Sequence, residues 1–414
     1  MLWSPQQDRA LVKVARWLES DQQVFRLFGY AGTGKTTLAK HFAEGVSGTV
    51  LFGAYTGKAA YVLRQKGCAG ATTVHSHIYN SKDKGRARLK ELEAELAEVL
   101  MELGVELQND TPERRQYYID SNVAVKNLRE KIEAEKNALA QPMFTLNPES
   151  AVADAALTVI DEVSMVDGRM GQDLLSFGTK VLVLGDPAQL PPVHGTGFFT
   201  EQEPDFMLDE IHRQARDNPI IAMATDVRNE KSLKLGTYGE SRVIEQAHLS
   251  PEEAMEADQI LVGRNKTRYA TNRRVRSLLG HEELLPIHDD RIVCLRNNHD
   301  LGLLNGAIWH VDDVGQSDEE LIYMTIRSDD GGTPIEVEAH THYFLGNEDK
   351  LGWWERKNAE EFDYGYALTG HKAQGSQWPY VMAFDESWCF RKDRWKWLYT
   401  VLTRAAERIT VVRM

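Results

Sequence analysis

The amino-acid sequence predicts an α/β fold with two parallel-sheet domains and two insertions, one helical and one β-rich. Continuous apolar runs alternate with helical stretches in the first half of the chain and again after residue 258, as in parallel sheets covered on both faces. A glycine-rich loop separates the first apolar run from the helix that follows it. The length of 414 residues exceeds what one hydrophobic core usually serves, so at least two domains are expected.

The first domain begins with an amphipathic helix at about residues 5–19, followed by the apolar strand VFRLFG at 24–29. Three further apolar runs are expected to complete its sheet, at 49–56, 156–166 and 180–190, and the last two end in acidic turns. We therefore expect strands that alternate with helices in this domain.

A charged segment at 80–150 interrupts the first domain, which is expected at 1–79 and 151–205. Apolar residues recur in this segment in steps of three and four, which predicts two helices in an antiparallel hairpin. The first helix, of about 20 residues, would be about 30 Å long. The apolar positions are Leu89, Leu92, Leu96, Val99, Leu103, Leu128, Ile132 and Leu139.

The second domain repeats the alternation, with a strand and a helix at 259–279 and with strands around YVMAFD and ERITVVRM near the end of the sequence. The stretch 306–361 differs, because apolar and polar residues alternate between Gly- and Asp-rich turns, as in small β-barrels. We therefore expect a parallel-sheet domain at 206–305 and 362–414 that carries a small barrel at 306–361.

The composition is that of an ordinary globular protein, with 42% hydrophobic and 27% charged residues. No apolar run approaches the ~18 residues of a membrane span, and the amphipathic start does not have the pattern of a signal peptide. The separated cysteines Cys68, Cys294 and Cys389 indicate neither a zinc site nor a disulfide framework, so a reduced cytoplasmic protein is expected. With a formal net charge of −14, any nucleic-acid contact must come from a local groove.

The sequence GYAGTGKT at 29–36 matches the phosphate-loop pattern GxxxxGK[ST] and lies between a strand and a helix, the context in which that pattern binds nucleotides. Its glycines let backbone N–H groups face a phosphate, Lys35 reaches the terminal phosphates and Thr36 ligates Mg²⁺. The expected nucleotide-binding residues of the loop are Gly29, Gly32, Thr33, Gly34, Lys35, Thr36 and Thr37.

Two acidic residues follow the strand in VIDEVSM. Beside a phosphate loop, Asp161 would hold Mg²⁺ through its outer shell, and Glu162 would orient or deprotonate the attacking water. A glutamate next to the aspartate favours hydrolysis over transfer of the phosphate to a substrate. The sequence GDPAQLPPV at 185–193 ends the next strand, and its Gln189 is a neutral side chain suited to sensing a γ-phosphate.

Hydrolysis also needs positive charge on the phosphoryl group in the transition state. Two arginines are candidates, Arg213 in LDEIHRQARDNPI and Arg404 in WLYTVLTRAAERI. Both would belong to the second domain and face the first across a cleft.

The motifs follow one another in a fixed order: SPQQDRAL, GYAGTGKTT, AYTGKAA, TTVHS, VIDEVSM, GDPAQLPPV, IHRQA, YALTGHKAQGSQW and LYTVLTRA. This set resembles the superfamily 1 helicases of the RecD-like type, and most closely their phage Dda-like branch. The resemblance covers nearly the whole chain except 80–150. It implies two RecA-like motor domains, with ATP in the cleft between them, DNA across both, and an SH3-like barrel in the second.

The resemblance also implies a role for each matching residue. Gln7 would read adenine, and Arg213 and Arg404 match the catalytic positions of the second motor domain. The matching phosphate, metal and catalytic positions of the first are Lys35, Thr36, Asp161, Glu162 and Gln189. The matching contacts to single-stranded DNA on the first motor domain are Thr56, Lys58, Thr73 and His75.

The loop YALTGHKAQGSQW at 366–378 resembles the motif that joins the nucleotide cleft to the DNA groove. Its polar side chains donate to phosphates or reach a base edge, and Gly375 lets a strand approach closely, at the border of the nucleotide site. The loop would shift against DNA when the cleft closes on ATP. The expected DNA contacts are Thr369, His371, Lys372 and Gln374. Trp353 and Trp354 are candidates for base stacking.

Two features depart from the family pattern. Family members often place a short β-hairpin wedge between the TVHS and DEVSM motifs, where this chain has the segment 80–150. That segment is a wedge, a DNA guide, an arm for a partner such as a single-strand-binding or replisome protein, or a solvated insertion without a direct role. Tyr55 stands where relatives commonly have proline, which leaves the shape of the first DNA contact open.

The expected function is an ATP-dependent DNA helicase that moves as a monomer on single-stranded DNA and acts at duplex junctions in a bacterial or phage-infected cell. The family implies 5′→3′ movement, and the preference for DNA over RNA also rests on the resemblance. Two alternatives stay open. One is a translocase that displaces bound proteins without unwinding, and the other is a nucleotide-gated switch that recruits a partner through 80–150.

Overall fold

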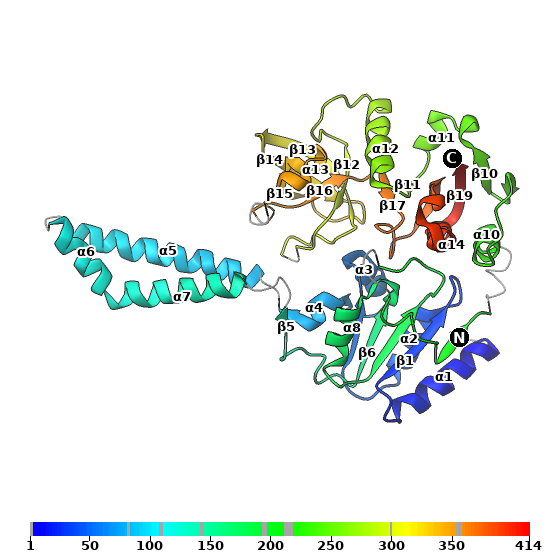
Figure 1. Cartoon of the computed structure of the whole chain (residues 1–414), viewed down its shortest axis with the longest axis horizontal. Coiled ribbons are helices and arrows are strands. Elements are labelled where there is room, and N and C mark those ends of the chain that lie inside the picture. The colour runs from blue at the N-terminus through cyan, green and yellow to red at the C-terminus, as the bar shows by residue number, and fades with distance from the viewer. Residues whose placement is uncertain are drawn as a thin grey trace. The chain divides into compact units, whose positions relative to one another are not determined.

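The computed structural model describes residues 3–80, 83–106, 111–140, 145–192, 197–210, 218–298, 300–352, 356 and 358–414. The chain forms two compact units, a smaller one of His75–Ala153 and a larger one of the remaining residues. Figure 1 traces the elements of each unit. None of the described helices is long and apolar enough to cross a membrane.

The larger unit contains a first sheet of six strands in the order β3-β2-β6-β7-β1-β8, and every neighbouring pair is parallel. Strands covered on both faces need apolar residues on both sides, and β7 accordingly buries all of its residues. The strands are β1 (Val24–Gly29), β2 (Val50–Ala54), β3 (Thr72–Thr73), β6 (Leu157–Asp161), β7 (Val181–Gly185) and β8 (Phe206–Leu208). The predicted parallel sheet of the first domain is confirmed.

Helices pack against this sheet and against one another. Helix α1 begins with a capping box, in which the Ser4 hydroxyl accepts from the Gln7 backbone N–H and the Gln7 side-chain oxygen accepts from the Ser4 N–H. The buried face of α1, which includes Val14 and Trp17, packs onto α2 and the sheet. The helices are α1 (Pro5–Leu18), α2 (Lys35–Glu44), α3 (Gly57–Gln65), α8 (Gly168–Leu175) and the 3₁₀ turn η1 (Val163–Met165).

The second sheet of the larger unit also has six strands, in the order β17-β11-β18-β19-β10-β9, and all neighbouring pairs are parallel except β9 with β10. Its core includes Trp397 and Leu402 from helix α14, packed with Val381 and Ile409 from two strands. The strands are β9 (Gly236–Tyr238), β10 (Ser241–Glu245), β11 (Gln259–Val262), β17 (Ala367–Thr369), β18 (Trp378–Asp385) and β19 (Ala405–Arg413). The helices are α10 (Pro219–Arg228), η2 (Gln246–His248), α11 (Pro251–Met255), α12 (Asn265–Leu278), η5 (Ser387–Asp393) and α14 (Arg394–Leu402).

An antiparallel sheet of five strands, in the order β15-β14-β13-β12-β16, is inserted in the second domain. The segment just before edge strand β16 bonds to the opposite edge strand, β15. The Glu360 N–H donates to Glu338 O, and Glu360 O accepts from the His340 N–H. The sheet therefore curls back on itself, as expected of a small barrel. Its elements are β12 (Arg291–Cys294), β13 (Ile308–Ser317), β14 (Leu321–Ser328), β15 (Ile335–His340), α13 (Thr341–Phe344), η3 (Glu348–Lys350) and β16 (Phe362–Tyr364).

The strand pairings correct the predicted limits at two places. Strand β8, at 206–208, pairs with β1, so the first domain extends past residue 205. Strands β12 and β16 pair with each other in the curled sheet, so that sheet begins near residue 291 and ends near 364 rather than spanning 306–361. These strands have three or four residues each, too few to show the period that the sequence prediction uses.

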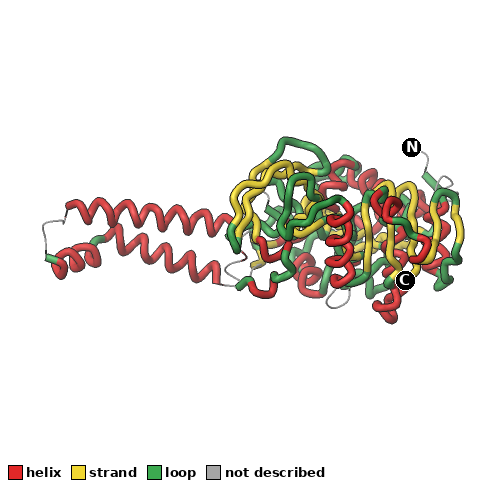
Figure 2. Tube along the Cα trace, turned by 90° about the horizontal axis from the view of Figure 1, so that it is seen from above, coloured by secondary structure: helices red, strands yellow, loops and turns green. Residues whose placement is uncertain are grey.

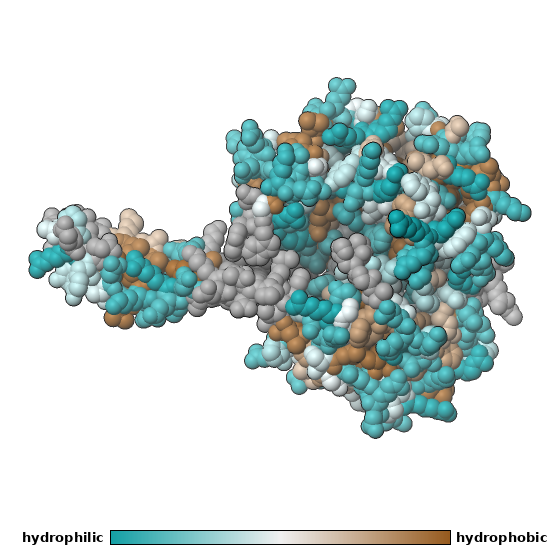
Figure 3. Space-filling model, in the orientation of Figure 1, coloured by the Kyte–Doolittle hydropathy of each residue, from teal (hydrophilic) through white to brown (hydrophobic). Residues whose placement is uncertain are grey.

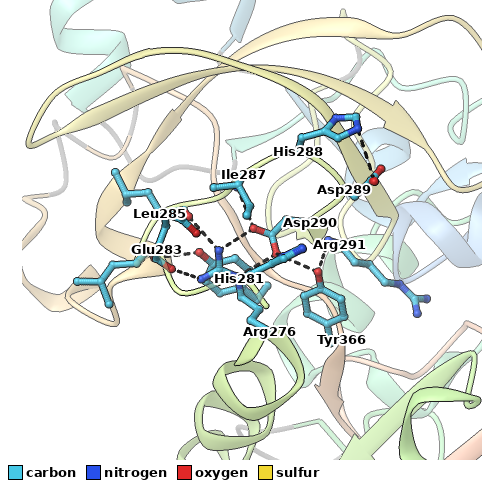
Figure 4. A network of polar contacts seen from close by, with 12 residues as sticks. Arg276, His281, Glu283, Leu285, Ile287, His288, Asp289, Asp290, Arg291 and Tyr366 are labelled. Carbon is cyan, nitrogen blue, oxygen red and sulfur yellow. Dashed lines mark hydrogen bonds and ion pairs between the residues drawn. The ribbon is translucent and has the colours of Figure 1, made fainter. Parts of the chain in front are cut away.

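A buried polar network joins helix α12 to the start of the inserted sheet (Figure 4). Arg276 donates to both carboxylate oxygens of Asp290, at 2.9 and 2.8 Å, and to Leu285 O at 3.0 Å. Tyr366 donates to the same carboxylate at 2.9 Å, and the His281 ring lies 3.1 Å from it. Because Asp290 is fully buried, these partners replace the water that its carboxylate loses on folding.

The smaller unit is largely helical, as Figure 2 shows. The predicted pairing of two long helices is present, since Leu92 of α5 packs on Leu128 and Ile132 of α7. A short third helix, α6, lies between them in the sequence. Thr111 caps the start of α6, and Asn122 caps the start of α7 and so separates the two helices. The elements are α4 (Val74–Ile78), β4 (Tyr79–Asn80), α5 (Asp83–Glu106), α6 (Pro112–Ser121), α7 (Val123–Ala140) and β5 (Thr145–Leu146).

The surface of this helical unit is mixed in character. Figure 3 shows apolar residues among hydrophilic ones on its visible face. The large apolar side chains exposed on it are Met101, Tyr117, Tyr118 and Val123.

Candidate active site

The loop between β1 and α2 has the geometry of a phosphate-binding loop. Gly32 and Gly34 both have φ of +79°, a left-handed conformation that favours glycine. Gly34 forms the N-cap of α2 without a side-chain hydrogen bond, so the first N–H groups of this helix remain available to an anion. Gly29 packs tightly as well, because a Cβ there would lie 2.6 Å from the Thr33 hydroxyl.

A cavity of about 280 Å³ opens at this loop, and both parallel-sheet domains line it. From the predicted set, the cavity lining brings together Gly32, Gly34, Lys35, Thr36, Thr37, Asp161, Glu162, Gln189, Gly375 and Arg404. Gly29 and Thr33 support the loop from behind, and Thr33 is buried. Arg213 lies outside the described residues.

Lys35 and Thr36 occupy the first turn of α2 at this cavity. Lys35 Nζ donates to Gly29 O at 2.6 Å and to Tyr30 O at 3.2 Å, so the ammonium rests on the loop itself. The Thr36 hydroxyl donates to Asp161 Oδ2 at 2.7 Å. This pair of hydroxyl and carboxylate oxygens fits Mg²⁺, which prefers oxygen ligands and keeps several waters.

Glu162 lies at the cavity in a strained conformation. Its φ of 54° and ψ of 42° are left-handed, which costs roughly 1–2 kcal/mol for a residue other than glycine. Burial raises the pKa of this carboxyl, and the neighbouring Asp161 raises it further, against the opposing effects of Arg404 and Lys35. A raised pKa makes Glu162 a stronger base toward a water molecule in the cavity.

Arg404 brings positive charge to the cavity from the second domain. It is buried, and its guanidinium donates to Thr400 O, Ser376 O and the Thr403 hydroxyl at 3.1, 3.1 and 3.2 Å. These bonds hold the side chain within its own domain while it faces the carboxylate of Glu162 across the cavity.

The cavity also contains an unsatisfied amide oxygen. Gln189 is buried, and among the described residues its Oε1 has no hydrogen-bond partner. A buried acceptor without a donor is costly, and a water molecule in the cavity would satisfy it by donating a hydrogen bond.

Gln7 has a structural position in addition to its expected role. Its side-chain N–H donates to Thr33 O in the phosphate loop at 3.2 Å, while its oxygen completes the capping box of α1. The amide thus supports the loop from α1, and the adenine contact expected from the resemblance stays a prediction.

Three side chains of the second domain reach the segment that follows β7 in the first. The Tyr399 hydroxyl donates to Asp186 Oδ2 at 2.7 Å and accepts from the Ala31 N–H at 3.0 Å. The peptide of Leu190 is held by the Thr400 hydroxyl at 2.9 Å, and by the Gln374 amide at 3.1 Å. Sequence analysis missed Tyr399 and Thr400, because in WLYTVL they look like part of a buried helix.

The four residues expected to contact DNA from the first domain lie in four different structural environments. The Thr56 hydroxyl caps α3 by accepting from the Ala59 N–H at 3.2 Å. Lys58 Nζ donates to Asp330 Oδ1, in the turn after β14, at 2.7 Å. Thr73 is buried in β3 at the end of the sheet. His75 begins the smaller unit, where its ring lies 6.0 Å from that of Tyr79.

The loop 369–377 lies against helix α3, since a Cβ on Gly375 would be 2.7 Å from the Cβ of Ala59. Gln374 differs from expectation, because its side chain is buried and binds Leu190 O instead of facing solvent. Burial lowers the pKa of His371, which therefore favours the neutral form. Burial, together with Arg268, lowers the pKa of Lys372 to about 8.

The remaining member of the loop is Thr369, which is buried and accepts from the Lys372 N–H at 3.4 Å. The stacking candidates Trp353 and Trp354 lie outside the described residues.

Two family models match the chain, and together they contain the residues that line the cavity. A family model described as an AAA domain matches residues 3–248, and one described as a UvrD-like helicase C-terminal domain matches residues 364–412. The ATP-dependent RecD2 DNA helicase of Deinococcus radiodurans is 27% identical over 283 residues, which cover 61% of this chain and 35% of that protein. The chain therefore spans about a third of the length of this curated relative.

Solved structures share the fold over nearly the whole chain. A structure of two coordinating Pif1 helicases at forked double-stranded DNA has a TM-score of 0.53 at 16% identity and covers 99% of this chain and 92% of that one. Pif1 helicase from Candida albicans has a TM-score of 0.50 at 17% identity, with 100% and 94% covered. These structures confirm the predicted fold class.

The AAA-domain match contains the phosphate loop, the acidic pair and Gln189, the residues that the first domain brings to the cavity. It extends over more than half of the 414 residues. The chain belongs to the AAA-domain family.

Proposed function

We propose that the chain is an ATP-dependent DNA helicase that hydrolyses ATP as it moves along single-stranded DNA and thereby separates a duplex. One observation carries this proposal. A single cavity combines the phosphate loop and acidic pair of the first domain with Gly375 and Arg404 of the second. A nucleotide bound there would contact both domains, so its hydrolysis would change how they hold each other.

In the proposed reaction the N–H groups of the loop and of the start of α2 bind the phosphates. Lys35 leaves the carbonyls of Gly29 and Tyr30 for the terminal phosphates. Mg²⁺, when bound beside Thr36 and Asp161, would neutralise charge on the phosphates. Glu162 accepts a proton from the attacking water.

Arg404 stabilises the negative charge that develops on the transferred phosphoryl group. Its three hydrogen bonds within the second domain fix its direction, so its contribution depends on the distance between the two domains. Hydrolysis is therefore fastest when the cleft is closed.

Movement on DNA is proposed to follow from the loop 369–377, which borders the cavity at Gly375 and continues through Lys372 and His371. The relatives support this proposal: the curated relative is named a DNA helicase, and one Pif1 structure of the same fold is described as bound to single-stranded DNA. We further propose 5′→3′ polarity, a monomeric motor and membership of the Dda-like branch, because the motifs resemble those of RecD-like helicases.

The test measures ATP hydrolysis with and without single-stranded DNA, together with unwinding of duplexes that carry a 5′ or a 3′ single-stranded tail. A helicase of the proposed kind shows strong stimulation of hydrolysis by DNA and unwinds only the 5′-tailed duplex. Stimulation without unwinding, but with displacement of streptavidin from the strand, would identify a translocase. Hydrolysis that is indifferent to DNA would refute the motor and favour the nucleotide-gated switch.

A further inference from the structure

The Tyr399 hydroxyl reaches from the second domain to the first, where it donates one hydrogen bond and accepts another. It donates to Asp186, which follows β7, and accepts from the Ala31 N–H of the phosphate loop. Tyr399 and Asp186 are each about 2% exposed, so water does not replace either partner. One atom of the second domain thus joins two separate segments of the nucleotide site.

The chemistry of this contact favours an uncharged phenol that donates a hydrogen bond to the carboxylate. Burial and the Asp186 charge raise the pKa of Tyr399 well above its ordinary value, so the hydroxyl keeps its proton. Burial also raises the pKa of Asp186, while Lys35, the bond from Tyr399 and the bond from the Ala188 N–H lower it. The buried carboxylate therefore depends on Tyr399 as its side-chain donor.

The same turn of α14 also orients the catalytic arginine. Thr400, the next residue, accepts from the Leu190 N–H through its hydroxyl and from Arg404 Nε through its carbonyl. Leu190 follows Gln189, whose amide lines the cavity. The position of Arg404 relative to Gln189 is therefore set by how residues 399 and 400 lie against the first domain.

We propose that Tyr399 is a positioning residue for ATP hydrolysis, whose hydroxyl brings the phosphate loop and the segment after β7 into register with Arg404 when the cleft closes. This inference rests on the proposed function for the identity of the nucleotide. It adds a residue that acts through Asp186 and Ala31 and does not itself line the cavity.

The test compares Tyr399→Phe with Tyr380→Phe in the full chain. Tyr380 is a matched control, because it is a buried tyrosine of the same domain whose hydroxyl pairs with Thr410 at 3.0 Å, within the second sheet. We expect Tyr399→Phe to lower kcat for ATP about tenfold, the loss typical of one hydrogen bond to a charged group, with KM changed by less than about threefold. Tyr380→Phe should leave both constants near the wild-type values.

A second measurement does not depend on turnover. Binding of a fluorescent ADP analogue is measured alone and with aluminium fluoride, which mimics the transferred phosphoryl group. Tyr399→Phe should bind the analogue alone as the wild type does and lose about tenfold of the extra affinity that aluminium fluoride provides. If the wild type hydrolyses ATP without any response to DNA, the motor proposal falls, while this ratio still decides the role of Tyr399.

The identity of the partner is tested with a second variant, Asp186→Asn, whose amide oxygen still accepts from the hydroxyl. We expect Asp186→Asn to keep more of the aluminium fluoride response than Tyr399→Phe, and Tyr399→Phe to have a smaller effect when Asp186 is replaced by alanine. Equal behaviour of Tyr399→Phe and Tyr380→Phe in kcat and in the binding ratio would overturn the proposal. If Tyr399→Phe fails to fold, Thr400→Val takes its place, with the same expected loss of the binding ratio.

Discussion

The two parallel-sheet domains use the same strand, loop and helix connection in opposite ways. After β1, the glycine-rich loop leads into α2, whose first N–H groups have no side-chain cap at Gly34. After β11, the chain leads into α12 through Gly263 and Arg264, and the carboxylate of Glu386 fills that turn. The first connection is open to an anion from outside, whereas the second holds an anion of the protein itself.

The geometry of the second connection is tight. One oxygen of Glu386 accepts from the N–H groups of Gly263 and Arg264 at 2.9 and 3.0 Å, and the other from Arg264 Nε and the Thr267 hydroxyl at 2.7 and 2.6 Å. Glu386 is fully buried, and a Cβ on Gly263 would lie 2.7 Å from its Cβ. Four hydrogen bonds therefore hold both oxygens of this carboxylate away from solvent.

The difference explains why the proposed nucleotide site lies at one of these two connections and not at the other. A loop that precedes a helix gathers N–H groups and attracts an anion, which is either internal or a ligand. In the second domain the carboxylate of Glu386 satisfies the N–H groups of Gly263 and Arg264. What the second domain brings to the cavity at the phosphate loop is instead Arg404 and Gly375.

The largest expected effect comes from the open connection. Lys35→Ala should lower ATP hydrolysis at least about 100-fold, with and without DNA, because the charge on the terminal phosphates is lost. Unwinding should be lost with it, and the melting temperature should be nearly unchanged, since the hydrogen bonds of the Lys35 ammonium to the described residues go to the loop carbonyls of Gly29 and Tyr30. Lys13→Ala, on the exposed side of α1, is the control for steady-state ATPase and thermal melting. An ATPase rate within about tenfold of the wild type would contradict the assignment of the phosphate site.

A change in the closed connection, which Glu386 fills, should affect the stability of the fold instead. Glu386→Gln should lower the free energy of unfolding by about 2 kcal/mol, because an amide cannot accept all four hydrogen bonds of the buried carboxylate. Glu407→Gln, at an exposed position of β19, should change it by less than about 0.5 kcal/mol. Urea denaturation of both variants provides the comparison. Equal unfolding midpoints for the two variants would show that the internal anion does not stabilise this turn.

The same variant has a defined pH dependence. Burial raises the pKa of Glu386, but the hydrogen bonds from Thr267 and Arg264 outweigh it and leave the pKa lowered. A lowered folded pKa contributes stability that is complete above the ordinary glutamate value of about 4.3 and is lost as the pH falls through the folded value. The stability difference between the wild type and Glu386→Gln should therefore shrink below about pH 4.

Much of this comparison could be predicted from the sequence, because the open connection has a local signature. The strand before GYAGTGKT and the acidic pair after β6 are contiguous motifs, and their residues meet at one cavity as expected. The closed connection has no such signature, since Glu386 lies 123 residues after Gly263. The role of Tyr399 could not be predicted from the sequence for the same reason, because its hydrogen-bond partners are 368 and 213 residues away.

A smaller effect is expected at the proposed DNA contact Lys372, where burial lowers the pKa of the ammonium. The pKa of Lys372 is about 8, so its charge is partly lost above neutral pH. We expect the affinity for single-stranded DNA to fall roughly threefold to tenfold between about pH 7 and about pH 9. Lys372→Arg should keep its charge and bind with a flatter pH profile, whereas the exposed Lys231→Arg should follow the wild type. Identical profiles for Lys372→Arg and the wild type, in fluorescence anisotropy, would remove Lys372 from the DNA interface.

The smallest expected effect concerns a second internal anion, Asp330, which differs from Glu386 because it is partly exposed. Asp330 pairs with Lys58, and both side chains keep some exposure, at 31% and 18%. Asp330→Asn should raise the affinity for single-stranded DNA about twofold to fivefold at low salt, because a phosphate then meets an unpaired ammonium. The gain should disappear in Lys58→Ala, and Asp312→Asn, which removes a carboxylate paired with Arg327 in the same inserted sheet, serves as control. An equal gain in Asp330→Asn and Asp312→Asn would mean that overall charge, rather than the pairing with Lys58, governs the contact.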